Sequence, residues 1–230
     1  MIRFHPDENM LVEYTAGSLS TALAIAVKAH LQMCSVCRER VSQLNMLGSV
    51  LLTNSEIKDE LEESPTNGVD DPSVSFGELM AKIKLMEGQP LPQKLTNQNR
   101  NTSLPSIVER LLPDKSSLAW RRVSPSLKQA NLQTGQAQFE VCLHKICKGG
   151  TVAHHDHRGM EVTLVLKGAF SDEDGSYKEG DFLVRQPGEK HRPCATQNQD
   201  CLCLSVVEAP VKLTGLLGTV INPFLSFRPG

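Results

Sequence analysis

Histidine and cysteine, the side chains best suited to bind a transition metal, are gathered in two separate stretches of this 230-residue chain. In the first 140 residues the only histidines and cysteines are His5, His30, Cys34 and Cys37. The other five cysteines and five histidines all lie between Cys142 and Cys203. Seven cysteines is an odd number and no secretory signal is expected, so reduced thiols are favoured over a disulfide framework. The distribution predicts two distinct sites.

The first cluster has the spacing of a structural zinc site. In His30-x3-Cys34-x2-Cys37 the imidazole and the first thiol share one face of a helix or its exit turn, and the second thiol follows one turn later. Zinc prefers thiolate and imidazole ligands in tetrahedral geometry, and a structural site fills all four positions. His5 is the remaining candidate in this half, so it is the predicted fourth ligand. The alternative is that both thiols are core residues without a metal. A redox pair is disfavoured because no β-α-β pattern surrounds the thiols.

The second cluster begins in a stretch with strand character. His155 and His157 are two residues apart, so on a strand they point to the same side, and Glu161 follows after a turn at Gly159. His191 lies further along the chain, after a second glycine-bounded run. Three imidazoles and one carboxylate form a borderline ligand set that suits zinc, iron, manganese or nickel.

These residues resemble the two cupin motifs, Gly-x5-His-x-His-x3-Glu-x6-Gly and Gly-x5-Pro-x-Gly-x2-His. The first motif matches from Gly149, and in the second Pro187 comes one place later than usual. The resemblance implies that the metal ligands are His155, His157, Glu161 and His191. His154 then points to the opposite side, unless the strand register slips by one residue. A cupin barrel that holds no metal is the alternative.

The hydrophobic pattern predicts helices in the first 90 residues and strands after Trp120. Pro6-Asp7-Glu8 is typical of a helix start and Gly17 of a helix end. Helices are predicted over 9–16, 18–31, 35–52 and 76–86, with a solvated acidic loop over 58–72. The later runs alternate and are broken by Gly and Pro, with a hairpin turn at Asp174-Gly175. Such short strands indicate an antiparallel sandwich or barrel. We expect a multidomain α + β chain, with a zinc-bound helical bundle followed by an antiparallel β-barrel of the cupin, jelly-roll type.

Residues 88–103 contain Pro, Asn and Gln but few core formers, which is typical of a linker. The predicted domains are residues 1–90, a linker over 91–103, and residues 104–230. Residues 1–90 carry 7 Lys and Arg against 13 Asp and Glu, a net charge of −6, whereas residues 91–230 carry +4. An acidic zinc-binding half is a poor match for a DNA-reading finger, whose phosphate contacts need a basic face. No apolar run approaches the ~20 residues of a membrane span. We expect a cytoplasmic protein without direct nucleic-acid or membrane contact.

The His-x3-Cys-x2-Cys run with an upstream histidine resembles the zinc-binding anti-sigma domains. Joined to a cupin, it is similar to the ChrR-type anti-sigma factors. The resemblance implies that the helical domain binds and sequesters an extracytoplasmic-function sigma factor. It also implies that the cupin, with zinc or another divalent transition metal, senses singlet oxygen or organic peroxide. The sigma factor is then released and can bind RNA polymerase, so the protein regulates transcription. The residues have no catalytic role in this interpretation.

Two other functions could use the same residues. Three histidines and one glutamate also support cupin dioxygenases, so a metal-dependent dioxygenase with a zinc-binding helical N-terminal domain is the main alternative. A zinc-dependent DNA-binding regulator is the second, and the net charge of residues 1–90 opposes it. Cys194, three residues after His191, is a candidate for a redox role. His144 is predicted at the surface, and the other four cysteines of this stretch are predicted in the core.

Overall fold

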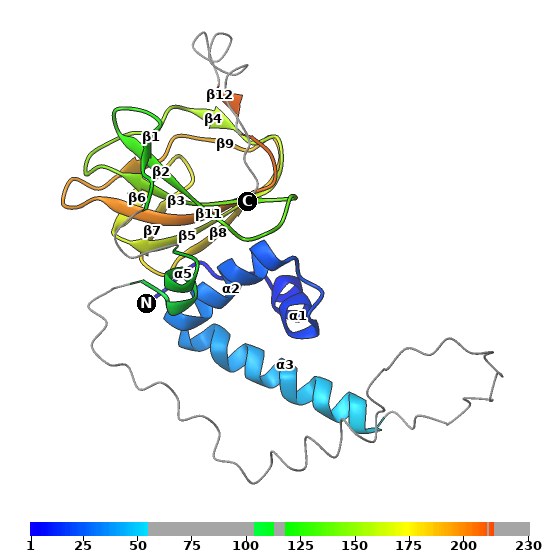
Figure 1. The fold of residues 1–230 in the computed structure, drawn as a ribbon. Helices are drawn as coiled ribbons and strands as arrows, with labels where there is room; N and C mark the ends of the chain where they lie inside the picture. The colour runs from blue at the N-terminus through cyan, green and yellow to red at the C-terminus, as the bar shows by residue number, and fades with distance from the viewer. Residues whose placement is uncertain (55–103, 113–117, 211, 214–230) are drawn as a thin grey trace, which may run out of the picture. The chain divides into compact units, whose positions relative to one another are not determined.

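The computed structural model describes residues 1–54, 104–112, 118–210 and 212–213 (Figure 1). The helices in these ranges are α1 (Glu8–Ala16), α2 (Thr21–Met33), α3 (Ser35–Asn54) and α5 (Ser106–Arg110). The described residues of 1–52 and of 104–213 belong to one compact unit. The predicted acidic loop, the helix over 76–86 and the body of the linker lie outside the described residues.

The first helix begins and ends within one residue of its predicted bounds, whereas α2 begins three residues later and ends two residues later than the predicted 18–31. The Asp7 side chain caps α1 by accepting a hydrogen bond from the backbone N–H of Met10 at 2.7 Å. Gly17 ends α1 with a φ of 72°, a left-handed conformation that glycine adopts without steric cost. α2 ends where Cys34 takes an extended conformation, and α3 starts at the next residue. The first cysteine therefore occupies the corner between two helices.

The apolar stripe predicted along α3 is only half packed. Val41 and Leu44 lie partly buried against the core. Leu47, Leu51 and Leu52 are exposed, with 54%, 62% and 77% of their surface accessible. The second half of this helix therefore presents apolar side chains to solvent.

The strands form one large sheet and two small ones, and all pairs are antiparallel. The six-stranded sheet has the order β1-β2-β3-β11-β5-β8. Its strands are β1 (Arg121–Arg122), β2 (Leu127–Leu132), β3 (Glu140–Ile146), β11 (Cys201–Val207), β5 (Glu161–Lys167) and β8 (Phe182–Arg185). One small sheet orders β10 (Cys194–Ala195), β6 (Ala169–Ser171) and β7 (Ser176–Lys178). The other orders β12 (Lys212–Leu213), β4 (His155–Asp156) and β9 (Lys190–His191).

The strands make a cupin-like sandwich, so the predicted closed barrel is wrong. Within the described ranges, the three sheets do not join into one continuous hydrogen-bonded ring. The strands of the small sheets are only two or three residues long. Such short strands offer too few backbone groups to extend the ladder around a barrel. The predicted antiparallel β architecture after Trp120 is confirmed.

The helices and the large sheet share one hydrophobic core. α2 packs against β5 and β11 (Figure 1). Its fully buried Ala26 and Val27 belong to the same cluster as Leu164 on β5 and Leu204 on β11. The predicted domain boundaries are not tested by this packing and stay a prediction. In the described residues no single helix is long and apolar enough to span a membrane, although the bent pair α1 and α2 passes that criterion jointly.

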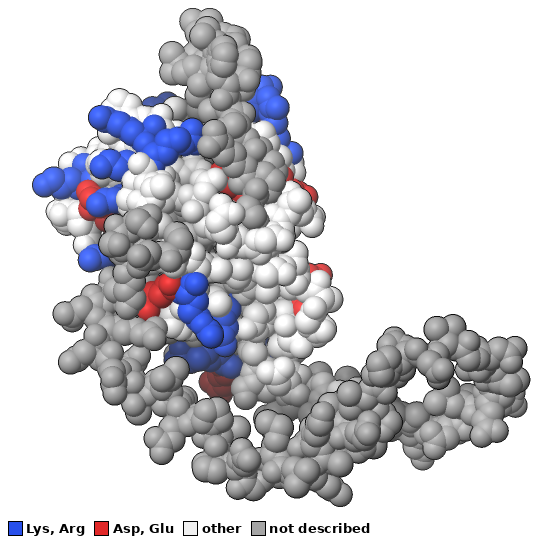
Figure 2. Space-filling view, viewed as in Figure 1, with Lys and Arg blue, Asp and Glu red and all other residues white. Residues whose placement is uncertain are grey.

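Basic side chains gather on the sheet part of the face seen in Figure 2. Arg122 on β1 is the cross-strand neighbour of Lys128 on β2, which in turn neighbours Lys145 on β3. Directly opposed like charges repel each other, and Asp200 compensates Lys145 through an ion pair of 3.0 Å. This local excess of positive charge agrees with the net charge of +4 in residues 91–230.

Candidate metal sites

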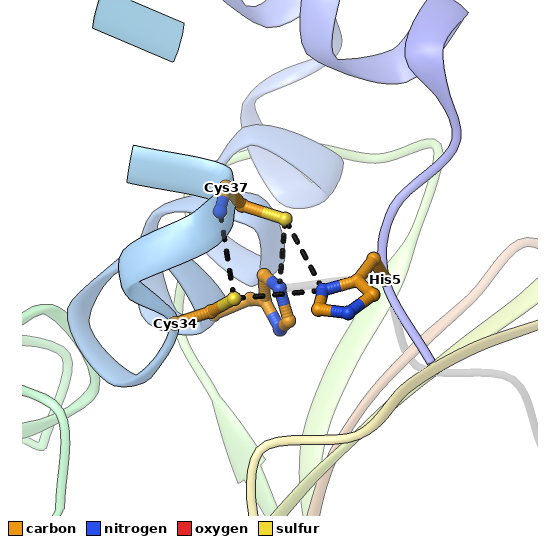
Figure 3. A group of neighbouring side chains, drawn as sticks. His5, Cys34 and Cys37 are labelled. Carbon is orange, nitrogen blue, oxygen red and sulfur yellow. Dashed lines mark hydrogen bonds between the residues drawn. The ribbon is translucent and has the colours of Figure 1, made fainter. Parts of the chain in front are cut away.

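The four residues predicted to bind zinc come together at the corner between α2 and α3. One ligand atom from each of His5, His30, Cys34 and Cys37 lies within 4.8 Å of the others. The Nδ1 atom of His5 is 3.5 Å from Cys34 Sγ and 3.3 Å from Cys37 Sγ (Figure 3). His30 Nε2 is 3.3 Å from Cys37 Sγ. His5 arrives from the segment before α1, so the cluster joins the N-terminus to the α2–α3 corner.

These separations fit a tetrahedral ion. Zinc bonds of about 2.3 Å to sulfur and 2.0–2.1 Å to nitrogen at tetrahedral angles place a sulfur and a nitrogen ligand about 3.5 Å apart. The three sulfur–nitrogen distances of 3.3–3.5 Å agree with that spacing. Two thiolates would also neutralise the double charge of the ion. The donor set therefore fits a closed, structural zinc site.

The protonation states in this cluster favour metal binding by His30. Its Nδ1 donates a hydrogen bond of 2.9 Å to the backbone carbonyl of Gly180, which leaves the lone pair of Nε2 facing Cys37. Burial lowers the pKa of His30 to about 4, so the ring is neutral at physiological pH. Burial and the neighbouring Cys34 thiol raise the pKa of Cys37 to about 12. A bound cation would reverse this shift, because a coordinating thiol loses its proton.

The second predicted set meets inside the sandwich. His155 on β4 and His191 on β9 are cross-strand partners, and their Nε2 atoms are 3.0 Å apart. Glu161, the first residue of β5, places its Oε2 3.1 Å from His157 Nδ1. All four side chains are buried, and their ligand atoms lie within 4.8 Å of one another. Short antiparallel pairing thus gathers residues that are up to 36 positions apart.

The hydrogen bonds around this cluster orient its imidazoles toward a shared centre. His155 Nδ1 donates to the carbonyl of Ala153 at 2.9 Å, and His191 Nδ1 donates to Asp172 Oδ2 at 3.0 Å. Both Nε2 atoms therefore carry lone pairs that face each other, an arrangement that a cation between them would stabilise. Both ring nitrogens of His157 are buried without a partner in hydrogen-bond geometry in the described part of the chain, although Glu161 Oε2 lies 3.1 Å from Nδ1. Such a group needs a partner, and a metal ion would supply one.

Burial also sets the charges of this second cluster. Desolvation lowers the pKa of His155 to about 4 and that of His157 to about 3, so these rings are neutral. Desolvation raises the pKa of Glu161 to about 7. Neutral imidazoles are the form that binds a metal, and a nearby cation would favour the ionised carboxylate. The donor set fits zinc or another divalent transition metal.

Several residues that support the two sites have no motif and were missed by sequence reasoning. Asp172 and Arg185 surround His191, and Gly180 contacts His30. A register slip does not replace His155 by His154, because His155 is the one that joins the cluster.

His144 is not the surface residue predicted. Its Nδ1 is 3.0 Å from Ser205 Oγ and its Nε2 is 3.4 Å from Cys142 Sγ, so it lies inside the sandwich. The signal was present, since His144 alternates with the core residues Cys142 and Ile146 on β3. Cys194 lies on β10, where its Sγ accepts a hydrogen bond from Thr151. Its redox role stays a prediction.

Comparison with known proteins agrees with this architecture. Residues 108–211 match the family model described as the ChrR cupin-like domain. The chain is 32% identical to the anti-sigma-E factor ChrR of Cereibacter sphaeroides, over 97% of this chain and 98% of that protein. This chain belongs to the ChrR family of anti-sigma factors. A crystal structure of Rhodobacter sphaeroides SigE in complex with the anti-sigma factor ChrR is similar to it, with a TM-score of 0.67 and 29% identity. That match covers 90% of this chain and all of that one.

Membership of the ChrR family bears on the alternatives. The ChrR protein of Cereibacter sphaeroides is an anti-sigma-E factor. The regulatory interpretation is thus favoured over a dioxygenase. The alignment with this ChrR protein covers nearly the whole chain, so both the helical part and the cupin part are similar to it.

Proposed function

We propose that this protein is an anti-sigma factor that sequesters an extracytoplasmic-function sigma factor and releases it under oxidative stress. The observation that carries the proposal is the similarity of this chain, over 90% of its length, to a chain in the solved complex of SigE with ChrR. Sequestration acts by mass action, because a sigma factor held in the complex is withdrawn from RNA polymerase. Since RNA polymerase works in the cytoplasm, this function also implies a cytoplasmic protein.

The helical part is proposed to bind the sigma factor, shaped by a zinc ion held by His5, His30, Cys34 and Cys37. The exposed apolar face of α3 supports this role, because contiguous exposed apolar side chains mark interaction surfaces. Its members lie on one side of the second half of the helix and are exposed by 52–68% of their surface: Met46, Leu47, Val50 and Leu51. A sigma factor helix packed on this face would remove the apolar surface from water.

The cupin part is proposed to sense the stress, with a divalent transition metal held by His155, His157, Glu161 and His191. The bound metal would supply a reactive centre for singlet oxygen or an organic peroxide. Release follows only if the signal changes the free energy of the bound and unbound states by different amounts. The burial of the ligand cluster supports this role, because little water is present to screen a change of charge there.

Single-round transcription with core RNA polymerase, an extracytoplasmic-function sigma factor from the same genome and the full chain tests the binding half. Leu51→Asp on α3 should raise the concentration needed for inhibition about 10-fold to 100-fold, because a charge on the apolar face opposes its burial. Val123→Asp is the matched control, since Val123 is an exposed apolar residue of the sheet part. Equal inhibition by both variants would refute binding through α3.

The same assay tests sensing. Illumination of the complex with a singlet-oxygen photosensitiser should restore transcription with the wild-type chain. The His155→Ala variant should inhibit as well as the wild type but fail to release the sigma factor. Loss of inhibition in His155→Ala would show that the cupin metal serves binding and not sensing.

A further inference from the structure

The segment before α1 is held by the sheet part of the molecule. The Phe4 carbonyl accepts a hydrogen bond of 3.0 Å from the backbone N–H of Phe182 on β8. Asp181, whose side chain is completely buried, accepts from the backbone N–H of Arg3 at 2.7 Å and from that of Phe4 at 3.3 Å. Its other oxygen accepts from Lys178 N–H at 2.9 Å. Asp181 therefore fixes the backbone immediately before His5.

The residue next to Asp181 positions a second member of the same cluster. The Gly180 carbonyl accepts the hydrogen bond from His30 Nδ1 that orients Nε2 toward Cys37. Gly180 has a φ of 90°, and a Cβ atom there would lie 2.4 Å from Cδ1 of Ile2. A left-handed φ of this size favours glycine, and a larger residue there would also have to displace the Ile2 side chain. One dipeptide of the sheet part thus orients two of the four ligands at the helical corner.

The segment that carries this dipeptide also reaches the second cluster. It runs from β7 in one small sheet through the turn at Gly180 to β8 at the edge of the large sheet. Arg185 on β8 binds Asp172 Oδ2 at 2.7 Å and Tyr177 Oη on β7 at 3.2 Å. Asp172 in turn orients His191. The Tyr177 ring packs on the Phe4 ring with 5.0 Å between centroids, which links this network back to the N-terminal segment.

We propose that the segment from β7 to β8 couples the two metal sites, with Gly180 and Asp181 as positioning residues for His5 and His30. The proposal rests on the proposed function in that both clusters bind a metal. A change at the cupin ligands moves Asp172 and Arg185, the β7–β8 segment transmits the shift, and the helical ligands lose their alignment. Coupling of this kind is reciprocal, so the metal at the helical corner also stabilises the cupin site.

The test measures how quickly the helical site of the full-length, zinc-loaded chain loses its metal. Excess chelating dye removes zinc while iodoacetamide alkylates the exposed thiols, and peptide mass spectrometry follows Cys34 and Cys37 separately from the other cysteines. Asp181→Asn should speed alkylation of these two thiols about 10-fold or more, as is typical when a residue that orients metal ligands is replaced. Glu179→Gln, an exposed carboxylate in the same turn, should leave the rate unchanged.

Coupling to the second cluster is read from the same two thiols. Asp172→Asn should speed alkylation of Cys34 and Cys37 several-fold, whereas Asp174→Asn removes only the exposed partner of Arg185 and should have a smaller effect. If Asp172→Asn changes the cupin metal content and leaves Cys34 and Cys37 at the wild-type rate, coupling is refuted.

A second variant keeps the test decisive if Asp181→Asn does not fold. Gly180→Ala should also speed alkylation, because its Cβ would displace Ile2, and adding Ile2→Ala should partly restore the slower rate. Wild-type rates in the folded Gly180→Ala variant would overturn the positioning role. If Cys34 and Cys37 of the wild-type chain react equally with and without chelator, the helical corner holds no metal and the proposed function itself fails.

Discussion

The two metal sites are built on opposite principles. At the helical corner three ligands come from eight consecutive residues, and the fourth arrives on an N-terminal segment held by the sheet part. In the sandwich the four ligands are spread over 37 residues and are gathered by strand pairing. The first set has two thiols and two imidazoles, which suit a structural zinc ion. The second has three imidazoles and one carboxylate, which suit zinc or another divalent transition metal. The site nearest the proposed partner is thus the one that depends on remote support.

The largest effect is expected from replacing a thiol at the helical corner. Cys34→Ser removes a ligand from a closed site, and binding of a structural zinc is coupled directly to folding. We expect the variant to lose one zinc per chain and at least 100-fold in affinity for the sigma factor, measured by metal analysis and by calorimetry. Cys147→Ser, at a half-buried cysteine outside both clusters, is the control. Full zinc content in Cys34→Ser would contradict the assignment.

An intermediate effect is expected in the sandwich. His191→Ala should remove the cupin metal, since it deletes a ligand and leaves the buried Asp172 without its imidazole partner. Affinity for the sigma factor should fall by less than about 10-fold, because the rigid large sheet retains its core. Metal analysis and the same calorimetry check this, with His144→Ala as a control that deletes a half-buried imidazole outside the ligand set. Loss of metal from His144→Ala but not from His191→Ala would reverse the assignment.

A smaller effect concerns the dependence of stability on pH and the half-buried His144. Burial lowers the pKa of this imidazole to about 4, below its ordinary value of 6.5, so the folded state favours the neutral ring. The stabilisation is complete above pH 6.5 and is lost as the pH falls toward 4, at up to about 1.4 kcal/mol per unit. Denaturant unfolding of the wild type and of His144→Gln should therefore differ in slope over this window. Parallel curves between pH 4 and 6.5 would contradict a neutral His144 in the folded state.

The same contrast explains how much could be predicted from the sequence. The spacing of His30, Cys34 and Cys37 is a local pattern of helix geometry, and its convergence with His5 could be predicted because few other ligands exist in that half. The cupin ligands could be predicted from motif spacing. The contacts of Gly180 and Asp181 with residues about 150–178 positions away leave no local signal.

The closed barrel could not be excluded from the sequence either. Residues 190–191, 194–195 and 155–156 have strand character, but a pattern of alternation does not fix where pairing stops. The ladders end after two residues, and the sheet remains open. The distinction between barrel and sandwich therefore depends on tertiary contacts that periodicity does not encode.

The smallest effect tests whether the helix start beside His5 contributes separately from the metal. The Asp7 carboxylate caps α1 through Met10 N–H, two residues after the ligand. Asp7→Ala should lower the free energy of unfolding by about 1 kcal/mol, whereas Asp7→Asn should keep most of the cap. Zinc content should be unchanged in both, because Asp181 and not Asp7 holds the backbone before His5. Denaturant unfolding with metal analysis checks both values. If Asp7→Ala also released the zinc, then His5 would be positioned by the start of α1. Its position would then not depend on the contact with Asp181.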